Sequence, residues 1–305
     1  MRVELKSIIC TTDFSDFSYH AIPYGIAFAK EFGAKLYICH VIDLSSAAMY
    51  GEIIADTVEQ QNRIMGYTLE HLKRIIGEQP VDWEPLITVG HTADEITSIA
   101  AERNVHLVIS ATHGRSGLKR LILGSVTQRL MHTLPCPLLM VRGPEHDFVA
   151  PENQEIRLQK ILVGCDFSPD SDLAFQYGLS LAQEFQAELH LVHVISPPLY
   201  KDLLKRSVKA EEKFQQDLHE KLNEEITKTV PDEARIWCTP QTTLLAGHPQ
   251  EELIKYAVVN KIDLIVLGVR GHSLMEKLFV GSTTDLVARQ APCPVLSVRP
   301  TIQGP

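Results

Sequence analysis

The sequence predicts an α/β protein made of two tandem domains, each an open parallel sheet of five strands with helices on both faces. Three observations lead to this fold class. The 305 residues are enough for two domains of ordinary size. Short runs rich in Ile, Val and Leu alternate with segments of helical periodicity, which is typical of a parallel sheet buried on both faces. The whole pattern also occurs twice along the chain.

The repeat is visible when "IICTTDFSDFSYHAIPYGIAFAKEFGAKLYICHVID", which begins at Ile8, is set beside "ILVGCDFSPDSDLAFQYGLSLAQEFQAELHLVHVIS", which begins at Ile161. Matching residues are 153 positions apart in this part of the chain and 157 positions apart from Gly90 and Gly247 onward. The second copy therefore carries extra residues after its second strand, where a loop tolerates a change of length.

Two domains follow from the repeat, and we place them at 1–144 and 157–301. Between them, "RGPEHDFVAPENQE" is rich in proline and polar residues. This composition is typical of a linker between domains, which we place at 145–156.

Each element of the first repeat is justified by its own pattern. The helix expected from Ser15 to Phe32 has apolar residues on one face, and the helix expected from Asp56 to Ile76 is long and polar. Ser15 and its counterpart Ser168 are expected N-cap residues, and Pro169 suits the first position of a helix. The other expected strands and helices are, in chain order, "SIICTT", "KLYICHVI", "WEPLITVG", "TADEITSIAAERN", "VHLVISAT", "SVTQRLMHTL" and "PLLMVRG".

The second repeat carries the same order of elements. Its expected strands are "KILVGCD", "ELHLVHVI", "ARIWCTPQTTLLAG", "IDLIVLGVRG" and "CPVLSVRP".

Composition narrows the classes of function. A formal net charge of -9, spread along the chain, gives no electrostatic footprint for nucleic acid, so no nucleic-acid partner is expected. No run of about 20 apolar residues occurs and the first residues lack a signal-peptide layout, so we expect no membrane partner and a cytoplasmic location. Six cysteines lie mostly inside apolar runs, which predicts buried free thiols; a metal site assembled from distant residues stays open.

Ligands of open parallel sheets bind beyond the carboxyl ends of the strands. Asp13 and Asp166 end the first strand of each repeat, and a glycine-containing loop follows each fourth strand. If the first and fourth strands are neighbours, the carboxylate and the loop face each other. The two loops lie in "SATHGRSGLKRLILGSVTQRLM" and "LGVRGHSLMEKLFVGSTTDLVA", where Gly, nine other residues and Gly-Ser recur.

The chemistry of this loop favours a phosphate. Gly114 and Gly271 can adopt positive φ and let a phosphate approach the backbone closely. Gly124 and Gly281 precede a helix whose first amides are unpaired and whose dipole attracts an anion. With a ribose at the strand-end carboxylate, the pattern describes a mononucleotide site, although a glycine turn beside a helix-capping Asp-x-Ser would look the same. Nearby basic residues would raise the positive potential: Arg115, Lys119, Arg120, Arg270 and Lys277.

The chain resembles the universal stress protein family, in its tandem two-domain form, over nearly its whole length. The resemblance rests on "TTDFS" and "CDFSPDS", on "HVI" in both second strands, on the loop spacing G-x2-G-x9-G-[ST], and on the closing "PCPLLMV" and "PCPVLSV". It implies a Rossmann-like fold, similar to adenine nucleotide α-hydrolases, with two domains related by a pseudo-twofold axis. It also implies pairing through the last strands, within the chain or in a homodimer.

The nucleotide-binding branch of the family implies site residues by position. Asp13 and Val41 would contact ribose and adenine, with Asp166 and Val194 as their counterparts. The implied phosphate-binding positions are Ala111, His113, Gly114, Arg115, Gly124, Ser125 and Val126 in the first repeat, and Gly268, Gly271, His272, Gly281, Ser282 and Thr283 in the second.

The first repeat departs from the family pattern at Ala111, which stands where the second repeat has Gly268. If this position needs positive φ, the methyl group costs about 1 kcal/mol or more, so the first site is expected to be the weaker one. The second repeat departs at Val269 and Arg270, where the family usually has Thr-His.

A regulatory or stress-protective protein that binds ATP, together with Mg²⁺, is therefore favoured over an enzyme. The sequence lacks the P-loop motif G-x4-G-K-[ST] and the nucleophile elbow G-x-S-x-G, so no catalytic residue is assigned and weak ATP hydrolysis is the most we expect. Three alternatives stay open: a slow ATPase, a nucleotide-independent interaction scaffold, and a protein specific for AMP or a cyclic nucleotide.

Overall fold

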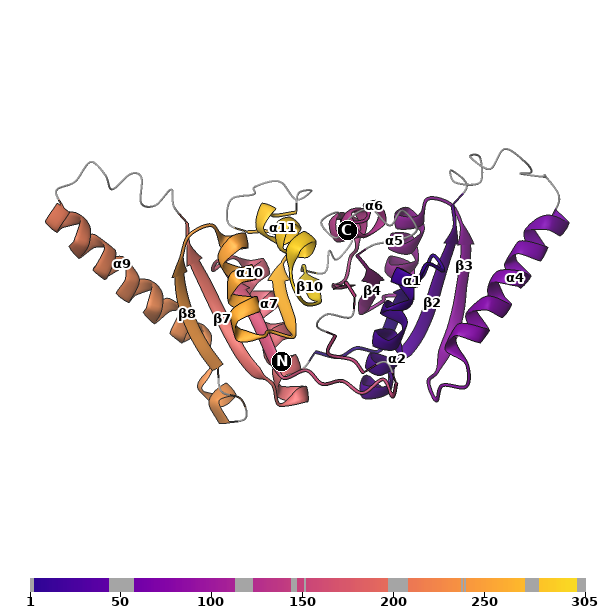
Figure 1. Cartoon of the computed structure of the whole chain (residues 1–305), viewed down its shortest axis with the longest axis horizontal. Helices are drawn as coiled ribbons and strands as arrows, with labels where there is room; N and C mark the ends of the chain where they lie inside the picture. The colour runs from indigo at the N-terminus through magenta and orange to yellow at the C-terminus, as the bar shows by residue number, and fades with distance from the viewer. Residues whose placement is uncertain are drawn as a thin grey trace. The chain divides into compact units, whose positions relative to one another are not determined.

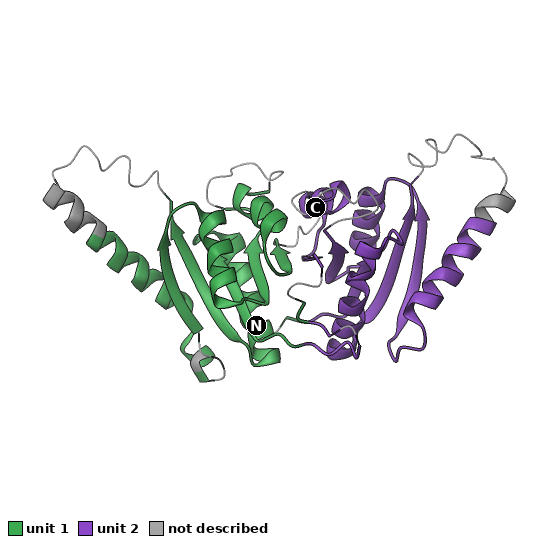
Figure 2. Cartoon of the chain, viewed as in Figure 1, with its two compact units in different colours: residues 1–3, 145–148, 157–300 green, residues 4–144, 149–156, 301–305 purple. Residues whose placement is uncertain are grey.

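A computed structural model of the chain describes residues 3–43, 58–112, 123–143, 147–150, 152–196, 208–236, 238, 240–271 and 280–300. The chain divides into two compact units, each built around one repeat (Figure 2). We call them the first-repeat unit, centred on residues 4–144, and the second-repeat unit, centred on residues 157–300.

The first-repeat unit holds a parallel sheet of five strands in the order β3-β2-β1-β4-β5 (Figure 1). Ile8 pairs with Leu36 on one side and with Leu107 on the other, so the first and fourth strands are neighbours, which is the condition for the carboxylate and the loop to face each other. The strands are β1 (Ser7–Thr11), β2 (Lys35–Ile42), β3 (Trp83–Val89), β4 (Leu107–Ala111) and β5 (Leu138–Val141).

Helices cover both faces of this sheet. Helix α2 packs on β1, β2 and β4, and α4 packs on β3, while α5 and α6 pack against each other. Because crossovers between parallel strands are right-handed, these two pairs of helices lie on opposite faces. The helices are α1 (Asp16–Tyr19), α2 (Ala21–Phe32), α4 (Val58–Ile76), α5 (Thr92–Glu102) and α6 (Ser125–Thr133).

The second-repeat unit has the same topology, with its five parallel strands in the order β10-β9-β6-β7-β8. Its strands are β6 (Lys160–Cys165), β7 (Glu188–Ile195), β8 (Pro240–Ala246), β9 (Leu264–Gly268) and β10 (Val295–Val298). Its helices are α7 (Pro169–Phe185), α9 (Val208–Thr229), α10 (Pro249–Asn260) and α11 (Ser282–Gln290), with a short 3-10 helix η2 (Asp232–Ile236).

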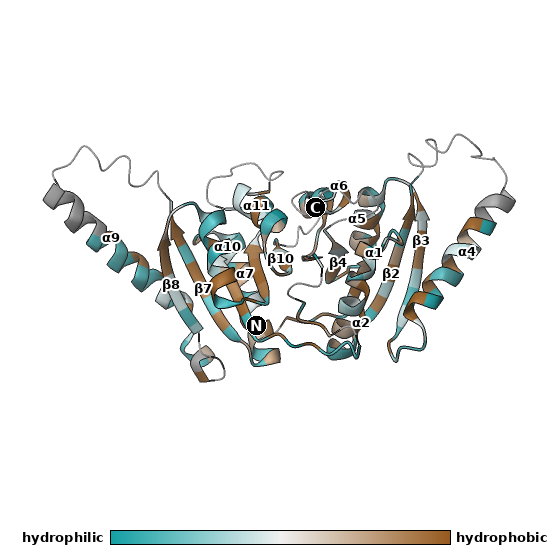
Figure 3. Ribbon diagram, viewed as in Figure 1, coloured by the Kyte–Doolittle hydropathy of each residue, from teal (hydrophilic) through white to brown (hydrophobic). Residues whose placement is uncertain are grey.

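The central strands form the core of each unit. Ile8, Ile9 and Val108 have no exposed surface, and neither do Ile161 and Val163. Figure 3 shows these strands as predominantly hydrophobic and helix α9 as largely hydrophilic. Near-continuous apolar strands thus confirm the predicted parallel sheets with helices on both faces. No helix among the described residues is long and apolar enough to span a membrane.

One expected helix is broken. The apolar pattern predicted a continuous helix from Ser15 to Phe32, but α1 stops at Tyr19 and α2 starts at Ala21. Pro23 supplies the reason, because its ring would clash with the carbonyl of Tyr19, four residues earlier, in a continuous helix. Proline is tolerated in the first turn of a new helix, which is its position in α2.

One expected strand starts later than predicted. The run "ARIWCTPQTTLLAG" begins at Ala234, but residues up to Ile236 lie in η2 and β8 starts at Pro240. Proline lacks a backbone N–H and suits the first residue of a strand, so the ladder begins there.

Two short segments of the chain pack into the unit of the other repeat. Val3 belongs to the second-repeat unit, where its backbone N–H donates to the buried Ser180 hydroxyl at 2.7 Å. Residues 149–156 belong to the first-repeat unit, closed by an antiparallel bridge between Val149 and Ile156.

Candidate functional site

In the second repeat, the strand-end carboxylate and the loop after β9 are in close contact. Asp166 follows β6 directly, and its Oδ1 accepts a hydrogen bond from the Ser168 backbone N–H at 3.0 Å. A Cβ atom placed on Gly271 would collide with Oδ2 of Asp166. Glycine therefore lets the loop approach the carboxylate, and its φ is not positive, so the conformational reason expected from the sequence is wrong.

Gly268 also serves close approach rather than positive φ. A Cβ atom at this position would lie 2.6 Å from the carbonyl carbon of Asp170, at the start of α7. The glycine thus lets the first turn of α7 pack directly on the end of β9, as the third glycine of a dinucleotide-binding loop does. Gly268 does not have positive φ, so the alanine at the corresponding position, Ala111, is not expected to pay the cost of positive φ.

The helix after each loop begins without a side-chain cap. Gly281 precedes α11 and Gly124 precedes α6, and a glycine at the N-cap has no side chain with which to cap the helix. In α11 the first intrahelical bond runs from the Asp285 N–H to the Gly281 carbonyl at 3.0 Å. The amides of the three residues between them, Ser282 to Thr284, consequently have no acceptor within the helix.

The same bonds fix both helix starts to the preceding strand. Thr284 Oγ1 donates to the Gly268 carbonyl at 2.7 Å, and Thr127 Oγ1 donates to the Ala111 carbonyl at 2.7 Å. The N–H of Gly281 donates to Val269 at 2.8 Å, and that of Gly124 donates to Thr112 at 2.7 Å. The two uncapped helix starts are therefore held at the strand-end edge in the same way.

The helix that follows the first strand is capped in both repeats. The Ser168 hydroxyl accepts from the Ser171 N–H at 3.2 Å, and the Ser15 hydroxyl accepts from the Ser18 N–H at 3.2 Å. Both N-cap predictions are confirmed, and Pro169 occupies the first turn of α7 as expected. Of these two helix starts, the one after the glycine loop is the one whose first amides lack a side-chain cap.

In the first repeat, Asp13 is engaged by its own turn. Its Oδ1 accepts from the Ser15 backbone N–H at 3.0 Å and from the Ser15 hydroxyl at 2.6 Å. In the second repeat the corresponding hydroxyl, of Ser168, donates instead to the Arg270 carbonyl at 3.4 Å. The two carboxylates thus occupy the same position with different neighbours.

The charge of Arg270 is paired within the protein. Its Nε lies 3.3 Å from Oδ2 of Asp170, and its backbone N–H donates to the same oxygen at 3.1 Å. The sequence suggested that Arg270 adds free positive potential near a phosphate. The ion pair with a carboxylate at the start of α7 neutralises it instead.

A pair of phenylalanines at this edge was missed by sequence reasoning. Phe14 and Phe167 follow the two aspartates and have φ of 64° and 60°, a region that is costly for a bulky side chain. The turn places the Phe14 ring 4.2 Å from the His40 ring and the Phe167 ring 4.7 Å from the His193 ring. The signal was present in the sequence, since "DFS" recurs at both strand ends.

The histidines beneath these rings are oriented by the backbone. His40 Nδ1 lies 2.8 Å from the Thr12 carbonyl, and His193 Nδ1 lies 2.8 Å from the Cys165 carbonyl, so Nδ1 carries the proton in both. Burial lowers the pKa of His193, with the Cys165 carbonyl opposing part of the effect. His193 is therefore neutral at pH 7.

The remaining predicted residues divide into two groups. Val41 and Val194 follow these histidines in β2 and β7 and are 7% and 8% exposed, so only a small part of each reaches the surface. The other group lies outside the described residues: His113, Gly114, Arg115 and His272. In the part of the chain that the structure describes, no three His, Cys, Asp or Glu side chains gather to hold a metal ion.

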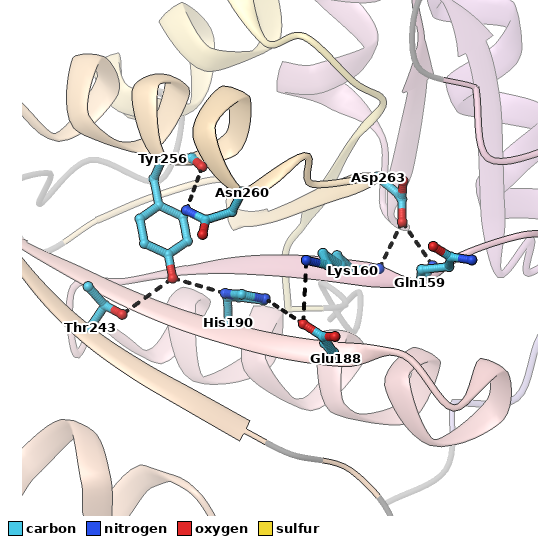
Figure 4. A network of polar contacts seen from close by, with 8 residues as sticks. All are labelled: Gln159, Lys160, Glu188, His190, Thr243, Tyr256, Asn260 and Asp263. Atoms are coloured by element: carbon cyan, nitrogen blue, oxygen red, sulfur yellow. Dashed lines mark hydrogen bonds and ion pairs between the residues drawn. The ribbon is translucent and has the colours of Figure 1, made fainter.

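A second polar cluster lies near the start of β7 (Figure 4). His190 is 2% exposed, and its Nδ1 lies 2.9 Å from the Tyr256 hydroxyl. Its Nε2 has no hydrogen-bond partner among the described residues and lies 3.5 Å from Oε2 of Glu188, which also contacts Lys160 at 3.7 Å. Burial lowers the pKa of His190, and Glu188 opposes part of this effect.

The fold and the strand-end edges define a tandem protein of two Rossmann-like α/β domains, each with an aspartate after its first strand and a helix that starts at a glycine after its fourth strand. The chain belongs to the universal stress protein family, whose family model matches residues 4–142 and 157–299.

The similar proteins include one that aligns with nearly the whole chain and one that aligns with about half of it. A universal stress protein of Synechocystis sp. is 25% identical over 320 residues, covering 97% of this chain and all of that protein. One of Methanocaldococcus jannaschii is 31% identical over 147 residues, covering 47% of this chain and 85% of that protein. The crystal structure of a universal stress protein from Archaeoglobus fulgidus aligns with a TM-score of 0.66 at 19% identity, covering 96% of this chain and 98% of that one. The last supports the tandem fold.

Proposed function

We propose that this universal stress protein binds an adenine nucleotide, ATP with its Mg²⁺, at the strand-end edge of each repeat and acts as a regulatory or stress-protective protein. One observation carries the proposal. The helix after each loop starts at a glycine whose backbone does not require glycine, so the missing cap leaves amides for a ligand.

The conformation at these glycines supports this point. Gly281 has φ of -62° and Gly124 has φ of -58°, values that any residue adopts. Among the described residues, a Cβ atom on Gly281 would meet nothing closer than 3.5 Å, which is ordinary contact. Ser or Asp would cap the helix at least as well. Serine is the N-cap of the helix that follows the first strand in each repeat, at Ser15 and Ser168. Glycine instead leaves the positive end of the dipole open to an anion.

The ligand would lie between the aspartate and this helix start. Asp13 and Asp166 would accept hydrogen bonds from ribose hydroxyls, and the exposed edges of Val41 and Val194 would contact the base. Phosphates would take the amides at the helix start, with Mg²⁺ arriving as part of the nucleotide. The proposed phosphate positions are Ala111, His113, Gly114, Arg115, Gly124, Ser125 and Val126, and Gly268, Gly271, His272, Gly281, Ser282 and Thr283.

The proposal includes a cytoplasmic location and pairing through the last strands, within the chain or in a homodimer. Native mass spectrometry of the purified protein gives the subunit count and any nucleotide retained from the cell. A mass of one chain would exclude the homodimer.

Gly281→Asp tests the proposed function most simply. The new carboxylate would cap the amides of α11 and repel phosphate, so the variant should fold with unchanged or slightly higher stability and bind one fewer ATP per chain. Calorimetric titration with ATP·Mg²⁺ should give two sites in the wild type and one in the variant.

Gly66→Asp is the matched control. It makes the same change on exposed α4, with nothing within 4 Å of the new Cβ atom, and should keep both sites. A wild type that binds no adenine nucleotide would contradict the proposal.

A further inference from the structure

The first turn of α7 is tied to the loop after β9 by three contacts. Oδ2 of Asp170 accepts from the Arg270 backbone N–H at 3.1 Å and pairs with its Nε at 3.3 Å. The Ser168 hydroxyl donates to the Arg270 carbonyl at 3.4 Å. The backbone N–H and the backbone carbonyl of Arg270 are therefore both held by residues at the start of α7.

This tie sits between the two parts of the proposed site. Arg270 directly precedes Gly271, which lies against the Asp166 carboxylate. Asp170 is also well placed electrostatically, since a carboxylate in the first turn of a helix is stabilised by the helix dipole. Its side chain is only 11% exposed and that of Arg270 is 21% exposed, so water weakens the pair little.

The geometry points to Asp170 as a positioning residue of the second site. By holding Arg270, it fixes the loop at Gly271 against Asp166, and it also removes Arg270 from the set of phosphate-binding charges. This inference rests on the proposed function and deepens it, because it states which residue prepares the second site and which cation does not serve it.

The first repeat lacks this device. Phe17 stands in the place of Asp170 and is 44% exposed, and Ala111 stands in the place of Gly268. Phe17 has no carboxylate, so a tie like the one between Asp170 and Arg270 cannot form from this position. The second site should therefore be the more strongly preorganised one.

The test uses the full chain with Gly124→Asp as the parent, so that only the second site remains. Three variants are made in this parent: Arg270→Gln, Arg270→Gln with Asp170→Ala, and Arg270→Gln with Asp170→Asn. Removing the arginine first prevents a freed cation from masking the loss of the tie. ATP·Mg²⁺ affinity is measured by calorimetry, and folding is checked by thermal unfolding.

Arg270→Gln should bind ATP within about twofold of the parent, because the backbone N–H of residue 270 still donates to Asp170 and keeps the loop in place. Adding Asp170→Ala should weaken binding about tenfold, the loss expected of a charge-assisted hydrogen bond. Asp170→Asn should restore binding to within about threefold of Arg270→Gln, since its amide oxygen still accepts the backbone N–H. This rescue separates positioning from a general loss of stability.

Two results overturn the inference while leaving the proposed function intact. One is a large loss of ATP affinity in Arg270→Gln, which would make Arg270 a phosphate ligand. The other is equal affinity in the alanine and asparagine variants. If the alanine variant does not fold, Asp170→Glu, which displaces the carboxylate by one methylene group, replaces it with the same expectation. A parent that binds no nucleotide overturns both the inference and the proposed function at the second site.

Discussion

At the strand-end edge of the second repeat, α7 runs unbroken from Pro169 and packs on β9 through Gly268. At the same edge of the first repeat, the helix stops at Tyr19, and Ala111 stands where the glycine would be. The uncapped helix starts, by contrast, are held by identical bonds in both repeats. The repeats therefore share the proposed phosphate end of the site and differ at the helix that supports the loop.

Sequence differences accompany this structural difference between the two repeats. Pro23 prevents a continuous helix in the first repeat, whereas its counterpart in the second repeat is Gln176. In the second repeat, Asp170 in the first turn of α7 contacts the loop, and the close packing of this turn on β9 requires Gly268. The repeats thus differ at three positions around this helix, which in the first repeat are Phe17, Pro23 and Ala111.

Among the changes that would disturb the packing of α7 on β9, Gly268→Ala is expected to have the largest effect. Its methyl group would meet the backbone of Asp170 at 2.6 Å, so α7 must shift, at a cost of about 1–3 kcal/mol in the free energy of unfolding. The shift should also weaken nucleotide binding at the second site. Chemical denaturation and calorimetry measure the two effects.

The reverse change in the first repeat is the matched control. Ala111→Gly should leave nucleotide affinity unchanged, because the corresponding glycine does not have positive φ. It should cost about 0.5–1 kcal/mol of stability, as glycine in a strand does. An increase in affinity at the first site would show that the alanine methyl obstructs the ligand after all.

The sequence was sufficient for the architecture and insufficient for the loop. Alternation of apolar strands and amphipathic helices, repeated along the chain, predicted the two five-stranded parallel sheets. The role of Gly268 was misjudged, since close approach between a helix and a strand depends on residues 98 positions apart, such as Asp170 and Gly268. The helix break could have been predicted from Pro23, whose effect on Tyr19 is local.

The pairing of Arg270 with Asp170 could not be predicted from the sequence for a similar reason. A loop arginine near an expected phosphate invites the interpretation that it binds the phosphate. Its pairing with Asp170 depends on how closely α7 approaches β9, which no periodicity reports. Phe14 and Phe167 were visible as a shared motif, but their positive φ appears only in three dimensions.

A smaller difference between the repeats should appear with pH. Burial lowers the pKa of His190 and of His193 below the usual value of about 6.5, so the unfolded chain binds more protons than the folded one in mildly acidic solution. Their contribution to stability is complete above pH 6.5 and is lost as the pH falls through and below that value. Tyr37 stands in the place of His190 in the first repeat.

His190→Gln should therefore flatten the decrease in denaturation midpoint between pH 7.5 and pH 5. The groups facing this side chain are Glu188, Lys160 and Tyr256, of which Glu188 favours the protonated form and so limits the effect. His219→Gln, on the exposed surface of α9, is the control and should keep the wild-type slope. Equal slopes in the wild type and in both variants would show that His190 does not cause the decrease in denaturation midpoint.

The smallest expected effect concerns the thiols, where the repeats should behave alike. Burial raises the pKa of Cys39 to about 12 and that of Cys165 to about 11, and also raises that of Cys10. Since the thiolate is the reactive form, these cysteines should resist alkylation at pH 8. Cys238 is half-buried and should react first. Mass spectrometry of iodoacetamide-treated protein measures the order, and early labelling of Cys165 would contradict it.

The central claim is that the uncapped amides of α6 and α11 bind the phosphates of an adenine nucleotide. Backbone amide NMR of the full chain during titration with ATP·Mg²⁺ tests it most directly. The account predicts large shifts for Ser282 and Thr283, and for Ser125 and Val126, with the first pair lost in Gly281→Asp. Binding of ATP that leaves these four amides unshifted would contradict the account.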